Sequence, residues 1–288
     1  MRTVKNSRET RVFLLRNEKS SWRVAKREQK CLFIVKKYNM KTIIILGPTG
    51  SGKTSVSIEI AKAIGGEIIS ADSRALYKGM DIGTAKPTKE EMRGIPHYGL
   101  DLVEPGARFT VADWKHYAED KIKDIKARGK IPIVVGGTGL YIDALVYDYQ
   151  FKGPTGMKIG DTEQKTCSDR KEIKGDYVMV GIKWSTDELR ERLHKRITQM
   201  FRPELYDEVK KLVQCYGWDC GAMKSNVYEF AWRYLQGELS LEEAKTKCFF
   251  EDWHLAKRQM TWFKRNLHIV WVRLSDACPY VINLFVNQ

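Results

Sequence analysis

The residues with the clearest capacity for chemistry form one stretch, Gly47-Pro48-Thr49-Gly50-Ser51-Gly52-Lys53-Thr54. It fits the pattern G-x-x-x-x-G-K-[ST], in which successive backbone N–H groups and the start of a helix point at one phosphate. Lys53 would add a point charge, and the Thr54 hydroxyl could hold a Mg²⁺ ion. The residues expected to bind phosphate are Gly47, Thr49, Gly50, Ser51, Gly52, Lys53 and Thr54. The pattern indicates a phosphate ligand but does not say which molecule carries it.

The residues on either side of this stretch must position it. Residues 42–46 form a short β-branched run, which is typical of a buried parallel strand. Residues 55–64 repeat apolar side chains at helical spacing, and Gly65-Gly66 follow as a stop signal, so a helix is expected. A strand, a glycine loop and a helix in this order predict an α/β fold, with a P-loop NTPase-like parallel sheet flanked by helices.

Two further strands are expected to end beside the loop. Residues 67–72 form one, with Asp72 at its carboxyl end, and residues 131–135 form the other, followed by the glycine loop that holds Thr138. Ligands bind at the carboxyl ends of strands in open α/β sheets, so Asp72, Thr138 and Lys53 are expected to face one crevice. Asp72 could instead cap a turn, and the glycine loop could be a simple tight turn.

The rest of the chain predicts a continuation of the same domain. A polar, glycine-rich segment at 77–87 could line the site or be an ordinary loop. Helices are expected at 110–128, from 140, and at 185–200, 203–213 and 240–265, and strands at 177–182 and 269–272. The expected organisation is a basic extension outside the fold (1–39), a P-loop core (40–147), a flexible loop (148–176), C-terminal helices and returning strands (177–276) and a tail without a clear role (277–288).

Composition limits the class of protein. The chain has 288 residues and a net charge of +14, and no apolar run is long enough to span a membrane. Six scattered cysteines without C-x-x-C spacing indicate reduced thiols in a cytosolic protein. Residues 1–39 carry +9 of the charge. This segment could be a nucleic-acid arm or a transit peptide, but Met40 directly precedes the first strand, which favours an extension outside the folded domain.

Basic and aromatic residues alternate near the end of the last long helix. They are Lys257, Arg258, Lys264 and Arg265 with Trp253, Trp262 and Phe263. Such a pattern suits a nucleic-acid strand, because cations contact phosphates and rings stack on bases. A solvated basic face with its aromatic residues in the core explains the pattern equally well.

Five stretches together resemble one known family, the tRNA dimethylallyltransferases, also called tRNA isopentenyltransferases. They are GPTGSGKT at 47–54, ISADSRALYKGMDIGTAKP at 69–87, IPH at 95–97, PIVVGGTGLYIDAL at 132–145 and LAKRQMTWFKR at 255–265. The resemblance implies that a dimethylallyl group moves from dimethylallyl diphosphate to N6 of the adenine directly after the anticodon in tRNA. The phosphate-binding loop would then hold the diphosphate of the donor.

The resemblance also implies roles for individual residues. Asp72 would be the general base, Thr138 would hydrogen-bond near the reacting centre, and Lys53 with a Mg²⁺ at Thr54 would stabilise the leaving diphosphate. The residues implied to contact tRNA are Asp72, Ser73, Arg74, Ala75, Thr138, Lys257, Arg258 and Gln259. The implied partners are the tRNA anticodon loop and dimethylallyl diphosphate, and the protein is expected to be a cytoplasmic monomer.

The chain departs from the family pattern at three places. Relatives usually have an inserted helical domain where this chain has residues 148–176, so a shortened member is expected. The family's R-I-x-x-R motif, whose second arginine binds diphosphate, is cut short after Arg196-Ile197, and Arg192 or Arg202 could substitute. The usual Gly-Tyr is replaced by Asn226-Val227-Tyr228.

Two alternatives stay open on the sequence. A P-loop small-molecule kinase would use the same loop and require ATP, with a basic lid formed by residues 148–176. The lid residues would be Lys152, Lys158, Lys165, Arg170 and Lys171. A donor-binding protein could have kept the pocket and lost turnover.

Overall fold

The computed structural model describes residues 41–151 and 172–286. The basic extension, the basic lid and most of the loop expected at 148–176 lie outside the described residues. Within these ranges, no helix is both long enough and apolar enough to cross a membrane. The described cysteines are free thiols: Cys215, Cys220, Cys248 and Cys278.

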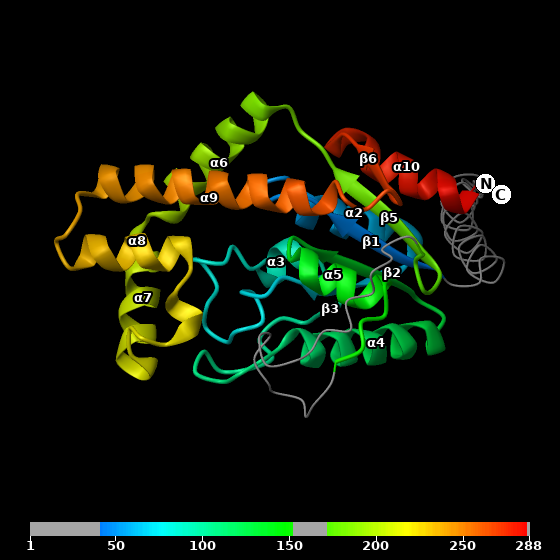
Figure 1. Cartoon of the computed structure of the whole chain (residues 1–288), viewed down its shortest axis with the longest axis horizontal. Coiled ribbons are helices and arrows are strands. Elements are labelled where there is room, and N and C mark those ends of the chain that lie inside the picture. The colour runs from blue at the N-terminus through cyan, green and yellow to red at the C-terminus, as the bar shows by residue number, and fades with distance from the viewer. Residues whose placement is uncertain (1–40, 152–171, 287–288) are drawn as a thin grey trace, which may run out of the picture.

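The described chain forms a parallel sheet of six strands with helices on both faces (Figure 1). The strands are β1 (Thr42–Leu46), β2 (Gly66–Ala71), β3 (His97–Tyr98), β4 (Ile131–Gly136), β5 (Tyr177–Ile182) and β6 (Ile269–Val272). Their spatial order is β3-β2-β4-β1-β5-β6, which puts β1 between β4 and β5. This arrangement confirms the predicted α/β fold with a parallel sheet flanked by helices.

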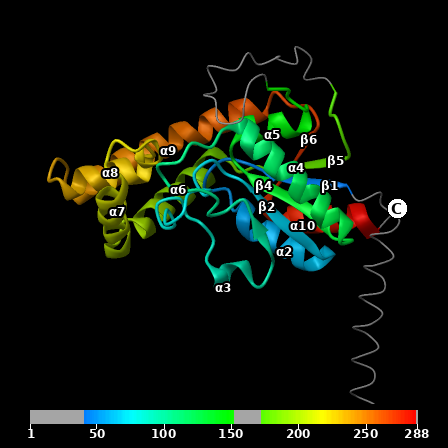
Figure 2. The same cartoon turned by 90° about the horizontal axis from the view of Figure 1, so that it is seen from below.

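Both faces of the sheet are covered, which explains why its central strands are apolar throughout. On one face α4 (Val111–Ala127) and α5 (Gly139–Val146) pack against Ile44 and Val134. On the other face α2 (Lys53–Ile64) and α10 (Leu274–Val286) pack against Ile43 and Val135 (Figure 2). Successive side chains of a strand point to opposite faces, so neighbouring residues supply the two cores.

Four helices form a separate cluster with a core of its own. They are α6 (Thr186–Met200), α7 (Pro203–Tyr216), α8 (Asn226–Leu235) and α9 (Leu241–Phe263), and we call them the helical cluster. The longest, α9, joins the two parts, because Cys248 and Ala256 are buried in the cluster while Phe263 is buried in the core beside α5 (Figure 1). Three of the expected helices begin with capping boxes, formed by Thr110 at the start of α4, Ser185 at the start of α6 and Ser240 at the start of α9.

The structure differs from the sequence prediction at the C-terminus. Residues 277–288 are not a tail without a role, since most of them belong to α10, and Ala277 and Val281 are fully buried against α2. Pro279 lies inside this helix, and proline is normally read as a helix breaker. The sequence patterns did not predict β3, α8, the short helix α3 (Lys89–Met92) or the 3-10 helix η1 (Gly221–Met223).

Candidate active site

The candidate site is an open pocket of about 1070 Å³ at the carboxyl ends of β1, β2 and β4. Three loops that the sequence analysis singled out line it: the P-loop (residues 47–54), the turn after β2 (Asp72–Ala75) and the β4 loop (Gly137–Gly139). The opposite wall comes from α6, α8 and α9 of the helical cluster. The pocket therefore lies between the sheet and the cluster, with α9 bridging both.

The P-loop takes a conformation that only glycine adopts easily. Gly50 and Gly52 have φ angles of 75° and 81°, and Gly52 is the N-cap of α2. A β-carbon at Gly50 would lie 2.8 Å from Leu193, so α6 packs directly on the loop. The first N–H groups of α2 have no acceptor within the helix, and they open onto the pocket.

Two predicted members of the P-loop shape it without lining the pocket. Gly47 and Ser51 are both buried, and Ser51 is 0% exposed. The Ser51 carbonyl accepts a hydrogen bond of 2.9 Å from Trp184 Nε1, which fixes the back of the loop to the segment after β5. The remaining predicted members, including Thr49 and Thr54, line the pocket.

Lys53 is held close to the P-loop backbone. Its Nζ donates to the Pro48 carbonyl at 3.2 Å. Burial lowers the pKa of Lys53 to about 8; the Asp72 carboxylate opposes this shift, and the positive charge of Arg196 adds to it. A cation whose pKa is lowered in this way gains from a nearby anion, so Lys53 suits a phosphate ligand.

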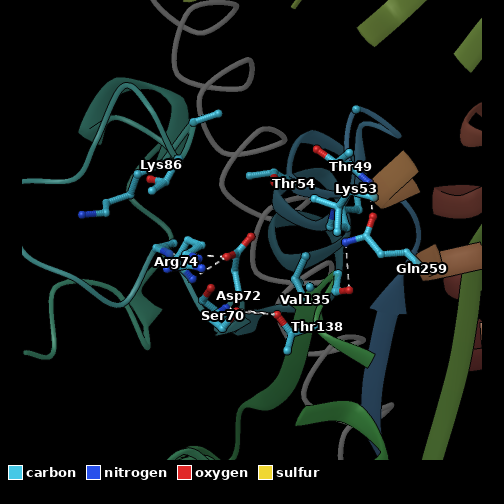
Figure 3. Close-up of a pocket in the computed structure, with 18 of the residues that line it drawn as sticks. Thr49, Lys53, Thr54, Ser70, Asp72, Arg74, Lys86, Val135, Thr138 and Gln259 are labelled. Atoms are coloured by element: carbon cyan, nitrogen blue, oxygen red, sulfur yellow. Dashed lines mark hydrogen bonds between the residues drawn. The ribbon is translucent and has the colours of Figure 1, made fainter. Parts of the chain in front are cut away.

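The two oxygens of Asp72 differ in their partners. Oδ1 accepts N–H groups of Arg74 at 2.8 Å and of Ala75 at 3.4 Å, so the alternative of a turn cap is realised at this oxygen. Oδ2 has no hydrogen-bond partner among the described residues. Figure 3 shows the carboxylate facing the pocket, across from Lys53 and Thr54. One oxygen holds the turn, and the other is left for a ligand.

Thr138 lies beside Asp72, on the neighbouring strand end (Figure 3). Its Oγ1 accepts the Ser73 N–H at 3.1 Å and lies 3.3 Å from Ser73 Oγ. Gly136, at the end of β4, lets the two strand ends approach, because a β-carbon there would lie 2.1 Å from the Ala71 carbonyl oxygen. The glycine loop after β4 is therefore more than a tight turn, since it brings Thr138 onto the turn after β2.

The guanidinium of Arg74 binds backbone carbonyls of the protein itself. Its guanidinium donates to the carbonyls of Gly221, Ala222 and Lys224 at 3.2, 3.3 and 3.2 Å. These bonds tie the turn after β2 to η1 and the residue that follows it, in the connection between α7 and α8. Ala75 is 5% exposed, and its N–H holds Asp72 rather than solvent.

The predicted tRNA-contacting residues of α9 separate in the structure. Gln259 bridges two loops: its Oε1 accepts the Thr49 N–H at 2.8 Å, and its Nε2 donates to the Gly137 carbonyl at 3.0 Å (Figure 3). Arg258 lines the pocket and is exposed. Lys257 lies outside the pocket lining, with its Nζ 5.8 Å from the centre of the Trp253 ring. The amide of Gln259 is thus a structural bridge.

Two arginines of α6 face the P-loop. Arg192 donates from Nε to the Gly50 carbonyl at 2.9 Å, and its guanidinium lies 4.4 Å from the Trp184 ring centre. Arg196 donates from Nη1 to the Thr49 hydroxyl. Arg202 lies outside the lining and faces Glu204. Of the two substitutes considered for the shortened motif, only Arg192 reaches the pocket, and Arg196 joins it one helical turn later.

The segment at 77–87 is an ordered wall of the pocket, formed by Gly83–Pro87. The Glu208 carboxylate accepts the N–H groups of Asp81, Ile82 and Gly83 at 3.0, 2.9 and 3.0 Å. Tyr228 donates its hydroxyl to the same carboxylate at 2.6 Å. The loop is ordered by a carboxylate at least 125 residues away in the sequence, so the local sequence pattern alone left its role undecided.

These features define a class of protein: a P-loop α/β protein with an anion-binding pocket between its sheet and a helical cluster. Comparison with protein families is consistent with that class. The model of the IPP transferase family matches residues 75–168 and 154–266. The model of the isopentenyl transferases matches residues 40–104. The chain belongs to the IPP transferase family, which confirms the resemblance found in the sequence.

Relatives match over most of their length. A tRNA dimethylallyltransferase of Bacillus cytotoxicus is 35% identical, over 84% of this chain and 92% of that protein. The crystal structure of a tRNA isopentenylpyrophosphate transferase from Staphylococcus epidermidis matches with a TM-score of 0.74 at 33% identity, over 86% of this chain and 100% of that chain. The corresponding structure from Bacillus halodurans matches with a TM-score of 0.75 at 30% identity, over 86% of this chain and 96% of that chain.

Proposed function

We propose that this chain transfers a dimethylallyl group from dimethylallyl diphosphate to N6 of the adenine directly after the anticodon of tRNA. One observation carries the proposal: a single pocket combines the P-loop with the carboxylate of Asp72 and the hydroxyl of Thr138. Membership of the IPP transferase family supports it, because relatives of this chain are named tRNA dimethylallyltransferases.

The donor's diphosphate would bind at the P-loop. Gly50, Gly52 and the start of α2 line the pocket, so their N–H groups would bind the anion, and Lys53 and Arg196 would add positive charge. Negative charge grows on the diphosphate as its bond to the dimethylallyl C1 breaks. Donors that are already in place stabilise this charge without reorganising, which lowers the barrier to departure.

The acceptor chemistry would centre on Asp72. An exocyclic adenine amine is a weak nucleophile, so it gains from losing its proton as the new bond forms. Oδ2 of Asp72 would take that proton while N6 bonds to C1 and the diphosphate leaves. The hydroxyl of Thr138, which lies next to Ser73, would hydrogen-bond the substrate at this point. An unpaired loop base enters such a pocket at lower cost than a paired one.

The oxygen atoms at the site fit a magnesium ion better than a transition metal. The described residues contain no cluster of three His, Cys, Asp or Glu side chains able to hold a metal. Thr54 and Asp72 do line the pocket, and Mg²⁺ commonly takes one or two protein oxygens together with substrate phosphates and water. Thr54 would hold the ion, which would supply positive charge to the diphosphate when bound.

The RNA would approach over α9. Arg258 lies at the pocket, where it would contact the strand near the target base, and Lys257 lies farther out beside Trp253. We propose the tRNA anticodon loop as the partner, a monomer as the working unit and the cytoplasm as the location.

A transfer assay tests this function. The protein is incubated with labelled dimethylallyl diphosphate and unmodified tRNA, in Mg²⁺ and without ATP. Label on the tRNA is the expected result. Phosphate transfer that requires ATP would indicate a kinase, and tight donor binding without product would indicate a homologue that has lost turnover; either outcome would overturn the proposal.

A further inference from the structure

A line of polar side chains runs from the helical cluster to the P-loop. Asn226, on α8, donates from Nδ2 to Oδ1 of Asp252 at 2.9 Å. Oδ2 of Asp252, on α9, lies 3.8 Å from Nη1 of Arg196 on α6. The same Nη1 donates to the hydroxyl of Thr49 in the P-loop. Three helices that are distant in sequence thus meet the P-loop through one carboxylate and one guanidinium.

The carboxylate in this line is buried, and each of its two oxygens has a partner. The side chain of Asp252 is 7% exposed, and that of Arg196 is 24% exposed. A buried carboxylate needs partners that offset its lost hydration, and here each oxygen faces a different partner. The amide of Asn226 holds one oxygen, which sets the plane of the carboxylate and directs the other oxygen toward Arg196.

Arg196 has N–H groups that remain available for a ligand. A guanidinium carries five N–H groups, and the contacts that Arg196 makes with the described residues all involve Nη1. Arg196 lines the pocket, and its charge contributes to the lowered pKa of Lys53, so the two cations share one anion site. A guanidinium fixed at one end binds phosphate oxygens with less loss of side-chain entropy than a free one.

We propose that Asp252, held by Asn226, is a positioning residue that fixes Arg196 across the P-loop so that Arg196 binds the diphosphate of the donor. This inference rests on the proposed function, because it deepens the description of the same donor site. Asp252 does not contact the diphosphate and acts only through Arg196.

The direction in which diphosphate affinity changes when Asp252 loses its charge distinguishes a positioning role from a purely electrostatic one. Asp252 is a negative charge near an anion site, so its removal should strengthen diphosphate binding if only charge mattered. Loss of positioning has the opposite effect, because Arg196 would have to be ordered when the ligand binds. A variant that removes the charge while keeping the size of the side chain therefore distinguishes the two.

The variant is Asp252→Asn, and the matched control is Glu251→Gln, which removes the same charge from the neighbouring residue of α9. Glu251 faces His254 rather than the pocket. We expect Asp252→Asn to raise the Kd for inorganic diphosphate and the KM for dimethylallyl diphosphate about tenfold, because Arg196 would lose its ion-pair partner and would have to be ordered when the ligand binds. The KM for tRNA in Asp252→Asn and all constants of the control should stay within about twofold. Unchanged or tighter binding in Asp252→Asn would overturn the proposal.

Two further variants keep the proposal testable if Asp252→Asn fails to fold, and they test whether Asp252 acts through Arg196. Asn226→Ala frees the carboxylate without removing it, so it should weaken diphosphate binding in the same direction by a smaller factor. In an Arg196→Gln background, Asp252→Asn should produce no further rise in Kd; a rise there would show that Asp252 acts by another route. Wild-type protein that binds diphosphate but transfers nothing would reject the proposed function alone, whereas wild-type protein that binds no diphosphate would reject both.

Discussion

At Asp72, one side chain combines a structural and a chemical part. Oδ1 holds the turn after β2 through the N–H groups of Arg74 and Ala75, while Oδ2 faces the pocket. Asparagine keeps an acceptor for the turn but cannot take a proton, so Asp72→Asn removes only the chemical part. We expect the rate of prenyl transfer to fall by about 10²–10⁴-fold with diphosphate binding nearly unchanged. Single-turnover transfer and calorimetric binding measure the two, and a rate near that of the wild type would show that Asp72 is not the base.

The lowered pKa of Lys53 predicts how the affinity for the donor's diphosphate depends on pH. Because burial lowers its pKa to about 8, the free protein loses this positive charge as the pH rises through that value. Affinity for inorganic diphosphate should fall above pH 8 relative to a protein that keeps its charge at this position, since the anion binds the protonated form of Lys53. Calorimetry between pH 7 and pH 10 measures this, and Lys53→Arg, which stays charged, should bind with a flatter profile. Equal profiles for the two proteins would contradict the assignment.

The glycines around the pocket act at the scale of whole elements, because they let α9 and the strands approach. At Gly137, a β-carbon would lie 2.6 Å from Nε2 of Gln259, the amide that links the P-loop to the β4 loop. Gly137→Ala should displace that amide, lower the free energy of unfolding by about 1–2 kcal/mol and raise the donor KM. Gly221→Ala is the control, because nothing lies within 4 Å of a β-carbon there. Equal melting curves and equal KM values for the two variants would reject a role for this bridge.

Local patterns predicted the elements that hold the P-loop, because their signals lie within a few residues. The capping boxes at Ser185 and Ser240 placed two helices in advance, and β-branched runs placed β1 and β4. The sequence did not predict α10, because its burial depends on a long-range contact. This helix contains Pro279 and becomes part of the core only by packing on α2. Its apolar residues carry no local sign that they are buried.

In the candidate site too, local patterns were predictive and long-range contacts were not. Strand ends and glycine loops predicted that Asp72 and Thr138 would lie together, since parallel strands end at one edge. The partners of Arg196 could not be read from the sequence, because Thr49 lies in the P-loop and Asp252 lies on α9, where Asn226 of α8 holds it. Gln259 shows the converse, since a motif position expected at the RNA is held by two backbone groups.

At the scale of the whole molecule, the P-loop and the strands beside it follow the basic extension (residues 1–39) in the sequence. The P-loop strand begins at Thr42, whose N–H donates to the Asp176 carbonyl, and β1 is paired on both sides by β4 and β5. The pocket is lined by residues from Thr49 to Trp262. Deleting residues 1–39 should therefore leave kcat and the donor KM within about twofold, because it keeps the P-loop, β1 and the residues that line the pocket from Thr49 to Trp262. The deleted segment carries +9, so affinity for tRNA should fall at low ionic strength and approach that of the full chain as salt increases. Steady-state kinetics and tRNA binding across a salt series measure both effects, and a large fall in kcat would mean that the extension completes the site.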